Sequence, residues 1–205
     1  MEQIYNEIIK GFQAMTWLEG VAVIFGILSV LFSKQNKIAV YPTGIVSTGI
    51  YIYLFFAAAL YAEASLNAYY LIMSIYGWYV WTRRDAQQQE TSISKVNRRE
   101  LTIAIAISAI GWLLIYLVLN QFTDSTTPLM DAFVSATAWS GMWLLAKRKV
   151  ENWIFLNISN FVAVPLLFYK HMALTALLTI FLFIIAVMGY YQWLRMLRQE
   201  TKQAS

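Results

Sequence analysis

Residues 101–120 read LTIAIAISAIGWLLIYLVLN, a run of twenty positions without a charged side chain. A helix that crosses the roughly 30 Å hydrocarbon core of a bilayer needs about 17–25 mostly apolar residues, so this run is long enough to span. Further stretches share its length and character, and the predicted spans are 14–33, 38–58, 64–82, 101–120, 128–146, 152–169 and 172–194. Lipid offers backbone groups no hydrogen-bond partner and barrel-like alternation is missing, so these spans should be helices. The sequence therefore predicts an all-α integral membrane protein with seven transmembrane helices.

The composition of the whole chain agrees with a membrane protein. Hydrophobic residues make up 60% of the 205 positions and charged residues 13%, whereas soluble domains are about 45–50% apolar and about 25% charged. Cysteine is absent and there is one histidine, which excludes disulfides, thiolate metal sites and multi-histidine metal centres. The sequence also lacks a Walker lysine loop and an HExxH motif. We therefore expect no cofactor, no metal and no enzymatic activity.

The distribution of Lys and Arg predicts the orientation. Seven spans place the amino terminus and the loops 59–63, 121–127 and 170–171 on one side, which holds two of the fifteen Lys and Arg residues, Lys10 and Lys170. The other thirteen of the fifteen lie on the opposite side, which the positive-inside rule makes cytoplasmic. We expect a multi-pass protein of the bacterial inner membrane, with a periplasmic amino terminus and a cytoplasmic carboxyl terminus. The basic clusters then reflect topology, so we expect the lipid bilayer and not nucleic acid as the partner.

An internal repeat is suggested by the ends of two spans, IYGWYVW at 75–81 and VMGYYQW at 187–193. Aligning them pairs Gly77 with Gly189 and Trp81 with Trp193, and a four-residue shift further upstream then pairs Asn36 with Asn152. A single linker span between two three-helix units leaves both units in the same orientation, as in transporters built from parallel repeats. The predicted 3+1+3 units are 1–82 for the first repeat, 83–127 for the cytoplasmic linker and inversion helix, and 128–205 for the second repeat and tail.

Amide side chains inside the spans are candidate ligand contacts, because polar groups at membrane depth require a packing or functional reason. Asn157 and Asn160 are three residues apart on one helix face, and Asn67 and Tyr70 repeat that spacing. Amides set among aromatic rings suit a flat polar heterocycle or a sugar. The alternative is that the amides hydrogen-bond neighbouring helices and hold the bundle together.

Other features of the spans have simpler explanations. Trp17, Trp81 and Trp193 lie at span ends, where tryptophan gathers at the membrane–water interfaces. The acidic residues Glu63 and Asp131 lie toward the outer ends of spans and not at the midplane. Carriers driven by protons or sodium ions generally need buried carboxylates, so this placement favours passive transport.

The chain resembles the PnuC family of bacterial vitamin transporters. The resemblance rests on LYAEASLNAYYLIMSIYGWYVW at 60–81, KRKVENWIFLNISN at 147–160 and GYYQW at 189–193. It implies a fold similar to the SWEET sugar transporters. The implied activity is uptake of a positively charged vitamin precursor by facilitated diffusion, followed by trapping through intracellular phosphorylation. It also implies a homotrimer.

The resemblance further implies a central substrate site of aromatic and amide side chains. Carried over to this sequence, the substrate-binding residues are Asn67, Tyr70, Tyr76, Trp78, Trp153, Asn157 and Asn160. The chain departs from the expected aromatics at Leu156 and Ala173. Nicotinamide riboside is the favoured substrate and thiamine the alternative, since both carry a cationic ring suited to aromatic contacts. An intramembrane enzyme or a non-transporting receptor is less favoured, because the spans lack a paired acid and base and the polar segments are short.

Overall fold

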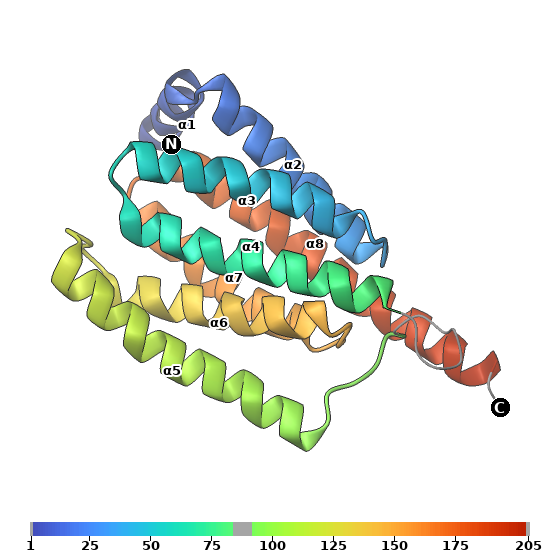
Figure 1. Cartoon of the computed structure of the whole chain (residues 1–205). Helices are drawn as coiled ribbons and strands as arrows, with labels where there is room; N and C mark the ends of the chain where they lie inside the picture. Colours follow the sequence, from blue (N-terminus) through green and yellow to red (C-terminus); the bar gives the residue numbers. More distant parts are fainter. Residues whose placement is uncertain (1, 84–91, 204–205) are drawn as a thin grey trace.

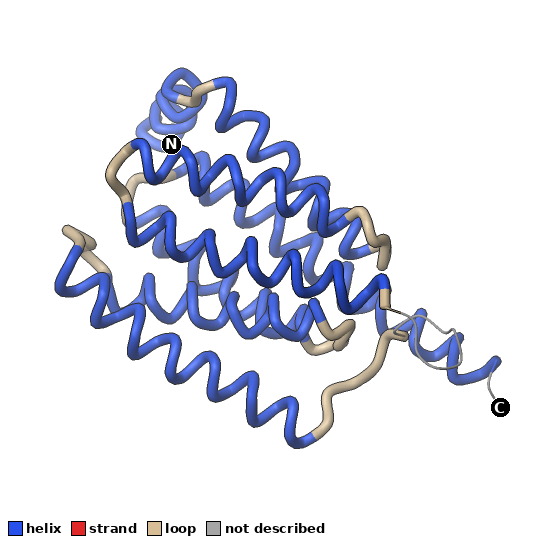
Figure 2. Tube along the Cα trace, in the orientation of Figure 1, coloured by secondary structure: helices blue, strands red, loops and turns tan. Residues whose placement is uncertain are grey.

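The computed structural model describes residues 2–83 and 92–203, which form a bundle of eight α-helices (Figures 1 and 2). The helices are α1 (Glu2–Ala14), α2 (Trp17–Lys34), α3 (Val40–Ala57), α4 (Tyr61–Thr82), α5 (Arg98–Phe122), α6 (Pro128–Ala146), α7 (Asn152–Tyr169) and α8 (Ala173–Gln203). Each of the seven predicted stretches overlaps one of the helices α2 to α8. Because consecutive helices run in opposite directions, the loops gather at two ends of the bundle. We call the end holding loops 58–60, 123–127 and 170–172 the cavity end, and the end holding loops 35–39 and 147–151 the basic end.

The first helix, α1, was not among the predicted stretches. Its 13 residues extend only about 20 Å at 1.5 Å per residue, which is too short to cross a bilayer. Glu2, Glu7 and Lys10 also interrupt its apolar residues, which is why the search for long apolar runs missed it. It packs against the start of α8, where Gly11 approaches the side chain of Leu174.

Five helices are long and apolar enough to cross a membrane, namely α2, α3, α5, α7 and α8. The helices α4 and α6 are as long but more polar. They contact each other inside the bundle, and α6 is also covered by α5 and α7 (Figure 1). Their polar residues therefore face protein or a cavity to a greater extent than lipid.

Four helix ends adopt the same backbone motif at matching places in the two halves of the chain. Asn36 and Arg148 end α2 and α6 with φ angles of 55° and 52°, and Ala59 and His171 end α3 and α7 with φ angles of 57°. After each, the next N–H returns to a carbonyl five residues earlier, for example Lys37 N to Phe32 O at 2.9 Å. This is the Schellman C-cap, which satisfies carbonyls that the helix itself leaves unpaired.

The matching contacts follow one constant spacing of 112 residues. Ser47 donates to Ala22 O and Ser159 donates to Val134 O, both at 2.8 Å, and both pairs are 25 residues apart. The equivalent of Asn36 is therefore Arg148, and the four-residue shift that paired Asn36 with Asn152 is wrong. Because the loops of the two halves have equal lengths, no shift is needed.

The basic end is filled by aromatic side chains. Trp81 and Trp193 are 1% and 0% exposed. The prediction that they are interfacial residues is therefore wrong. Their indole N–H groups cross between the halves: Trp81 donates to Leu145 O at 3.3 Å and Trp193 to Ser33 O at 3.0 Å. Trp81 lies two residues before Arg83, a place typical of a membrane interface, but a buried carbonyl from the other half of the chain pairs its indole N–H and allows an interior position.

Two further rings complete this aromatic cluster. The Tyr41 ring packs edge-on against Trp81 at 5.1 Å, and the Trp153 ring packs edge-on against Trp193 at 5.7 Å. Both rings occupy space opened by a glycine. A Cβ on Gly77 would lie 2.3 Å from the Tyr41 ring, and one on Gly189 would lie 2.7 Å from the Trp153 ring. The cluster therefore seals the basic end by close packing.

Candidate substrate cavity

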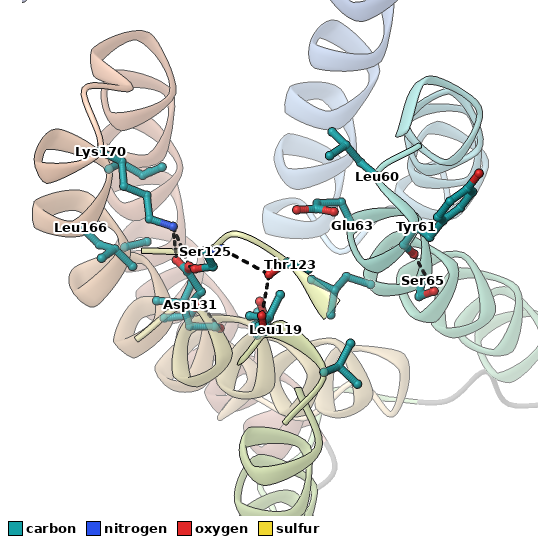
Figure 3. A pocket seen from close by; sticks show the side chains of 18 of the residues that line it. Leu60, Tyr61, Glu63, Ser65, Leu119, Thr123, Ser125, Asp131, Leu166 and Lys170 are labelled. Atoms are coloured by element: carbon teal, nitrogen blue, oxygen red, sulfur yellow. Dashed lines mark hydrogen bonds and ion pairs between the residues drawn. The ribbon is translucent and has the colours of Figure 1, made fainter. Parts of the chain in front are cut away.

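A cavity of about 1170 Å³ lies at the cavity end of the bundle (Figure 3). Its wall is formed by α4, α5, α6 and α7, by the loops after α3 and α5, and by Thr179 of α8. The volume slightly exceeds the roughly 300–1,000 Å³ of typical ligand pockets, so it is sufficient for a nucleoside-sized molecule.

One side of the cavity carries an ion pair. Lys170 Nζ lies 2.7 Å from Asp131 Oδ1 and 2.6 Å from Asp131 Oδ2. Ser125 Oγ donates to the same carboxylate at 2.6 Å, and Thr127 Oγ1 donates at 3.3 Å. Lys170 caps the carboxyl end of α7 and Asp131 lies in the first turn of α6. Each charge therefore lies at the helix end whose dipole stabilises it.

The opposite side is formed by the start of α4. Figure 3 shows Leu60, Tyr61 and Glu63 across the cavity from Lys170 and Asp131. Deeper in the wall, Tyr70 and Asn160 contribute a phenol and an amide, and Ser135 contributes a hydroxyl. Aromatic, amide, hydroxyl and carboxylate groups thus surround one space, which suits a polar ligand that carries positive charge.

At the basic end of the bundle, the segment that leads into α5 adds to the closure made by the aromatic cluster. Ser94 pairs with the loop after α6, with Ser94 N to Arg148 O at 3.1 Å and Val150 N to Ser94 O at 3.0 Å. The neighbouring Ile93 is 1% exposed within the aromatic cluster, and the Arg148 guanidinium lies 4.0 Å from the centre of the Trp81 ring. The large cavity therefore reaches only one end of the bundle.

Comparisons with known proteins agree with this architecture. A protein-family model described as "Nicotinamide mononucleotide transporter" matches residues 16–195. The chain belongs to this family. As a member of the nicotinamide mononucleotide transporter family with five apolar candidate spans, it is a multi-pass membrane protein.

Several curated proteins are similar to this chain over most of their length. The "Nicotinamide riboside transporter PnuC" of Escherichia coli strain K12 is 23% identical, over 93% of this chain and 90% of the relative. The protein of the same name from Neisseria mucosa is 25% identical over 94% and 77%. The "Riboflavin/roseoflavin transporter RibM" of Streptomyces davaonensis is 23% identical over 93% and 90%.

A solved structure shares the fold of this chain. The "Crystal structure of the Vitamin B3 transporter PnuC" matches with a TM-score of 0.72 and 22% identity, covering 97% of this chain and 89% of that one. The all-helical membrane fold expected from the sequence is confirmed to this extent: the chain shares the fold of a solved PnuC structure.

Two of the seven substrate-binding residues predicted from sequence, Tyr70 and Asn160, lie in the cavity wall. Two more amides lie on the same helices but bond to their own backbone. Asn67 Nδ2 donates to Glu63 O at 3.0 Å, and Asn157 Nδ2 donates to Trp153 O at 2.8 Å. The Oδ1 atom of Asn157 is buried without a hydrogen-bond partner, which leaves it an acceptor for a ligand.

The remaining three predicted residues lie away from the cavity. Trp153 belongs to the aromatic cluster at the basic end, with its indole N–H buried and unpaired. Tyr76 and Trp78 are 36% and 42% exposed near the basic end of α4. The structure thus brings Tyr70 and Asn160 together and separates them from Trp153, Tyr76 and Trp78.

Sequence reasoning assigned no role to Asp131, Lys170 or Ser125, although all three line the cavity. Asp131 begins one predicted span and Lys170 follows the end of the next, so a topology argument places both at the same end of the bundle. Their placement at the same end of the bundle is the feature of the sequence that could have indicated this ion pair.

Proposed function

We propose that this chain transports nicotinamide riboside into the cell by facilitated diffusion. The observation that carries the proposal is the cavity: a space large enough for a nucleoside, lined by apolar and polar side chains, reaches one end of the bundle, while packed rings fill the other. Such one-sided access is what a carrier presents in one of its alternating states. The names of several relatives support this substrate.

The proposed substrate site combines the cavity wall with the amides deeper in the bundle. Tyr70 and Asn160 contact the ligand from opposite helices, and the free Oδ1 of Asn157 accepts a hydrogen bond from it. Asn67 and the rings of Tyr76, Trp78 and Trp153 join the site when the bundle rearranges to open the basic end. Rings of this kind favour a cationic pyridinium.

The proposed architecture is a 3+1+3 arrangement, with 1–82 and 128–205 as parallel repeats and 83–127 as linker and inversion helix. It is supported by the constant 112-residue spacing of the helix caps and of the serine and tryptophan hydrogen bonds. In this arrangement α4 and α6 also cross the bilayer, and the halves move against each other around the site. A homotrimer in the bilayer belongs to the same proposal, and native mass spectrometry tests it.

The proposed location is the bacterial inner membrane, with the basic end in the cytoplasm and the cavity end in the periplasm. Alkaline phosphatase fused after Thr126 should then be active, whereas the same fusion after Gln88 should be inactive. The reverse pattern would contradict the orientation.

Binding to the purified protein tests the substrate. A ligand present at a hundred times its dissociation constant adds about 2.7 kcal/mol of stability, which a melting experiment in detergent resolves. Nicotinamide riboside should raise the melting temperature. In proteoliposomes the riboside should equilibrate without a proton or sodium gradient, and accumulation driven by such a gradient contradicts the passive mechanism. In cells, a separate intracellular kinase phosphorylates the riboside and thereby retains it.

Riboflavin is the second candidate substrate, because the riboflavin transporter RibM matches over a similar share of the chain. Thiamine remains an alternative by the chemical likeness of its cationic ring. Both belong in the same melting series. Stabilisation by one of them, without stabilisation by nicotinamide riboside, would replace the proposed substrate.

A further inference from the structure

Lys170 is the only basic residue among the described residues that line the cavity. Its ammonium group contacts both oxygens of Asp131, at 2.7 and 2.6 Å. Ser125 and Thr127 donate hydrogen bonds to Asp131 Oδ2 and fix the carboxylate in place. Both charged side chains are 22% exposed, so the pair is partly shielded from water.

The other ionisable groups of the cavity wall are acidic, apart from tyrosines. Glu63 lies across the cavity and Asp124 lies beside Ser125 in the loop after α5. A phosphate ester carries about −1.5 to −2 charges at neutral pH and binds best to arginine or lysine. In this cavity it would meet carboxylates on both sides, and a lysine whose charge is already matched.

We propose that Asp131 determines whether the cavity accepts a nucleoside or its 5′-phosphate, by keeping Lys170 away from a phosphate group. This inference rests on the proposed function, since it concerns the ligand of the same site. It also bears on the family's two names, because nicotinamide mononucleotide and nicotinamide riboside differ by one phosphate.

The ion pair occurs in only one half of the chain. At the positions 112 residues earlier, Glu19 corresponds to Asp131 and Ala58 corresponds to Lys170, so the first half keeps the acid and lacks the lysine. The lysine is therefore not part of what the two halves share. Its place in the cavity wall makes it a determinant of ligand choice.

The test measures dissociation constants of nicotinamide riboside and nicotinamide mononucleotide for purified protein in detergent. Asp131→Asn leaves Lys170 without its counter-charge and should tighten mononucleotide binding relative to riboside by about ten- to a hundredfold. Asp124→Asn changes the net charge equally without freeing a lysine, and it should shift the ratio much less than Asp131→Asn does. Adding Lys170→Met to Asp131→Asn should abolish the gain in mononucleotide binding.

The proposal is overturned if Asp131→Asn and Asp124→Asn shift the ratio equally, or if the gain survives Lys170→Met. Asp131→Ser is a second variant, because it also removes the carboxylate and leaves a smaller polar side chain in its place. If neither Asp131 variant shows a cooperative melting transition, the pair serves stability and the selectivity role is wrong. A parent protein that binds no riboside counts instead against the proposed function.

Discussion

The basic end and the cavity end of the bundle are built from the same kind of helix termini but are filled differently. At the basic end the two halves contribute matching parts: Trp81 and Trp193 each donate to the opposite half, and Tyr41 and Trp153 each fill the space beside a glycine. At the cavity end the halves differ, because the Lys170–Asp131 pair in the cavity wall comes from the second half and has no lysine at the matching place in the first. The closed end depends on features present twice, whereas the cavity wall contains an ion pair that occurs once.

The comparison also separates two kinds of interaction. Rings and indole N–H groups at the basic end are shielded from water, so their loss is measured as lost stability. Polar groups around the cavity are accessible to ligand, so their loss is measured as lost affinity. Substitutions at the two ends should therefore affect different measurements.

The largest expected effect on stability is at the glycine beside the Tyr41 ring. In Gly77→Ala the new methyl group would lie 2.3 Å from a buried ring, so the ring must move. Overpacking of this kind costs up to about 3 kcal/mol, measured as a lower melting temperature in detergent. Gly49→Ala is the matched control, because its added Cβ has no atom within 4 Å. Equal melting of the two variants would show that the basic end is not closely packed.

The next effect concerns affinity at the amides. Asn160→Leu should weaken riboside binding by about 1–3 kcal/mol, because a polar group of the ligand is left unpaired, with little change in melting. Asn67→Leu and Asn157→Leu should also weaken binding if the site extends toward the basic end. If all three variants bind like the parent, the amides are structural and the site must be assigned to the aromatic rings.

A smaller effect is expected where an indole N–H is removed from the aromatic cluster. Trp193→Phe removes the 3.0 Å hydrogen bond to Ser33 O, which then keeps only the backbone donor Asn36 N at 2.9 Å, and this should lower stability by about 1 kcal/mol. Trp112 donates to Leu129 O over the same 3.0 Å but is 39% exposed on α5, so Trp112→Phe removes the same kind of bond from a less closely packed place. A larger loss in Trp112→Phe than in Trp193→Phe would contradict the difference in burial.

The smallest effect is expected at the surface of the cavity end. His171 Nδ1 lies 2.9 Å from Glu7 Oε1, but the histidine side chain is 69% exposed. Exposed ion pairs contribute about 0–1 kcal/mol, so Glu7→Gln should change the melting temperature little. A loss as large as that of Gly77→Ala would show that α1 is an essential part of the bundle.

Helix positions were predictable from sequence because each long apolar run overlaps one helix. The bounds 128–146 and 152–169 match α6 and α7, since Pro128 starts one helix and the Lys147–Arg148 turn separates the two. The α1 helix was missed because its short amphipathic run contains three charges. The buried position of Trp193 was missed because its partner carbonyl lies in a distant part of the chain.

The candidate site was predictable only in part. Residue type marks Tyr70 and Asn160 as polar groups in apolar spans, and both line the cavity. Residue type does not reveal that Asn67 turns its amide to its own helix, because that depends on a side-chain rotamer. The contact between Lys170 and Asp131 depends on how α6 and α7 pack, which no local pattern encodes.

The hydrogen bond between Trp193 and Ser33 also has a consequence for biosynthesis. The two residues are 160 positions apart, and ribosomes add about 5–20 residues per second. The basic end of α2 therefore exists for roughly 8–30 s before the indole that completes it has been made. During that interval the aromatic cluster lacks its Trp193 ring, and a chain that stops before α8 never completes the cluster.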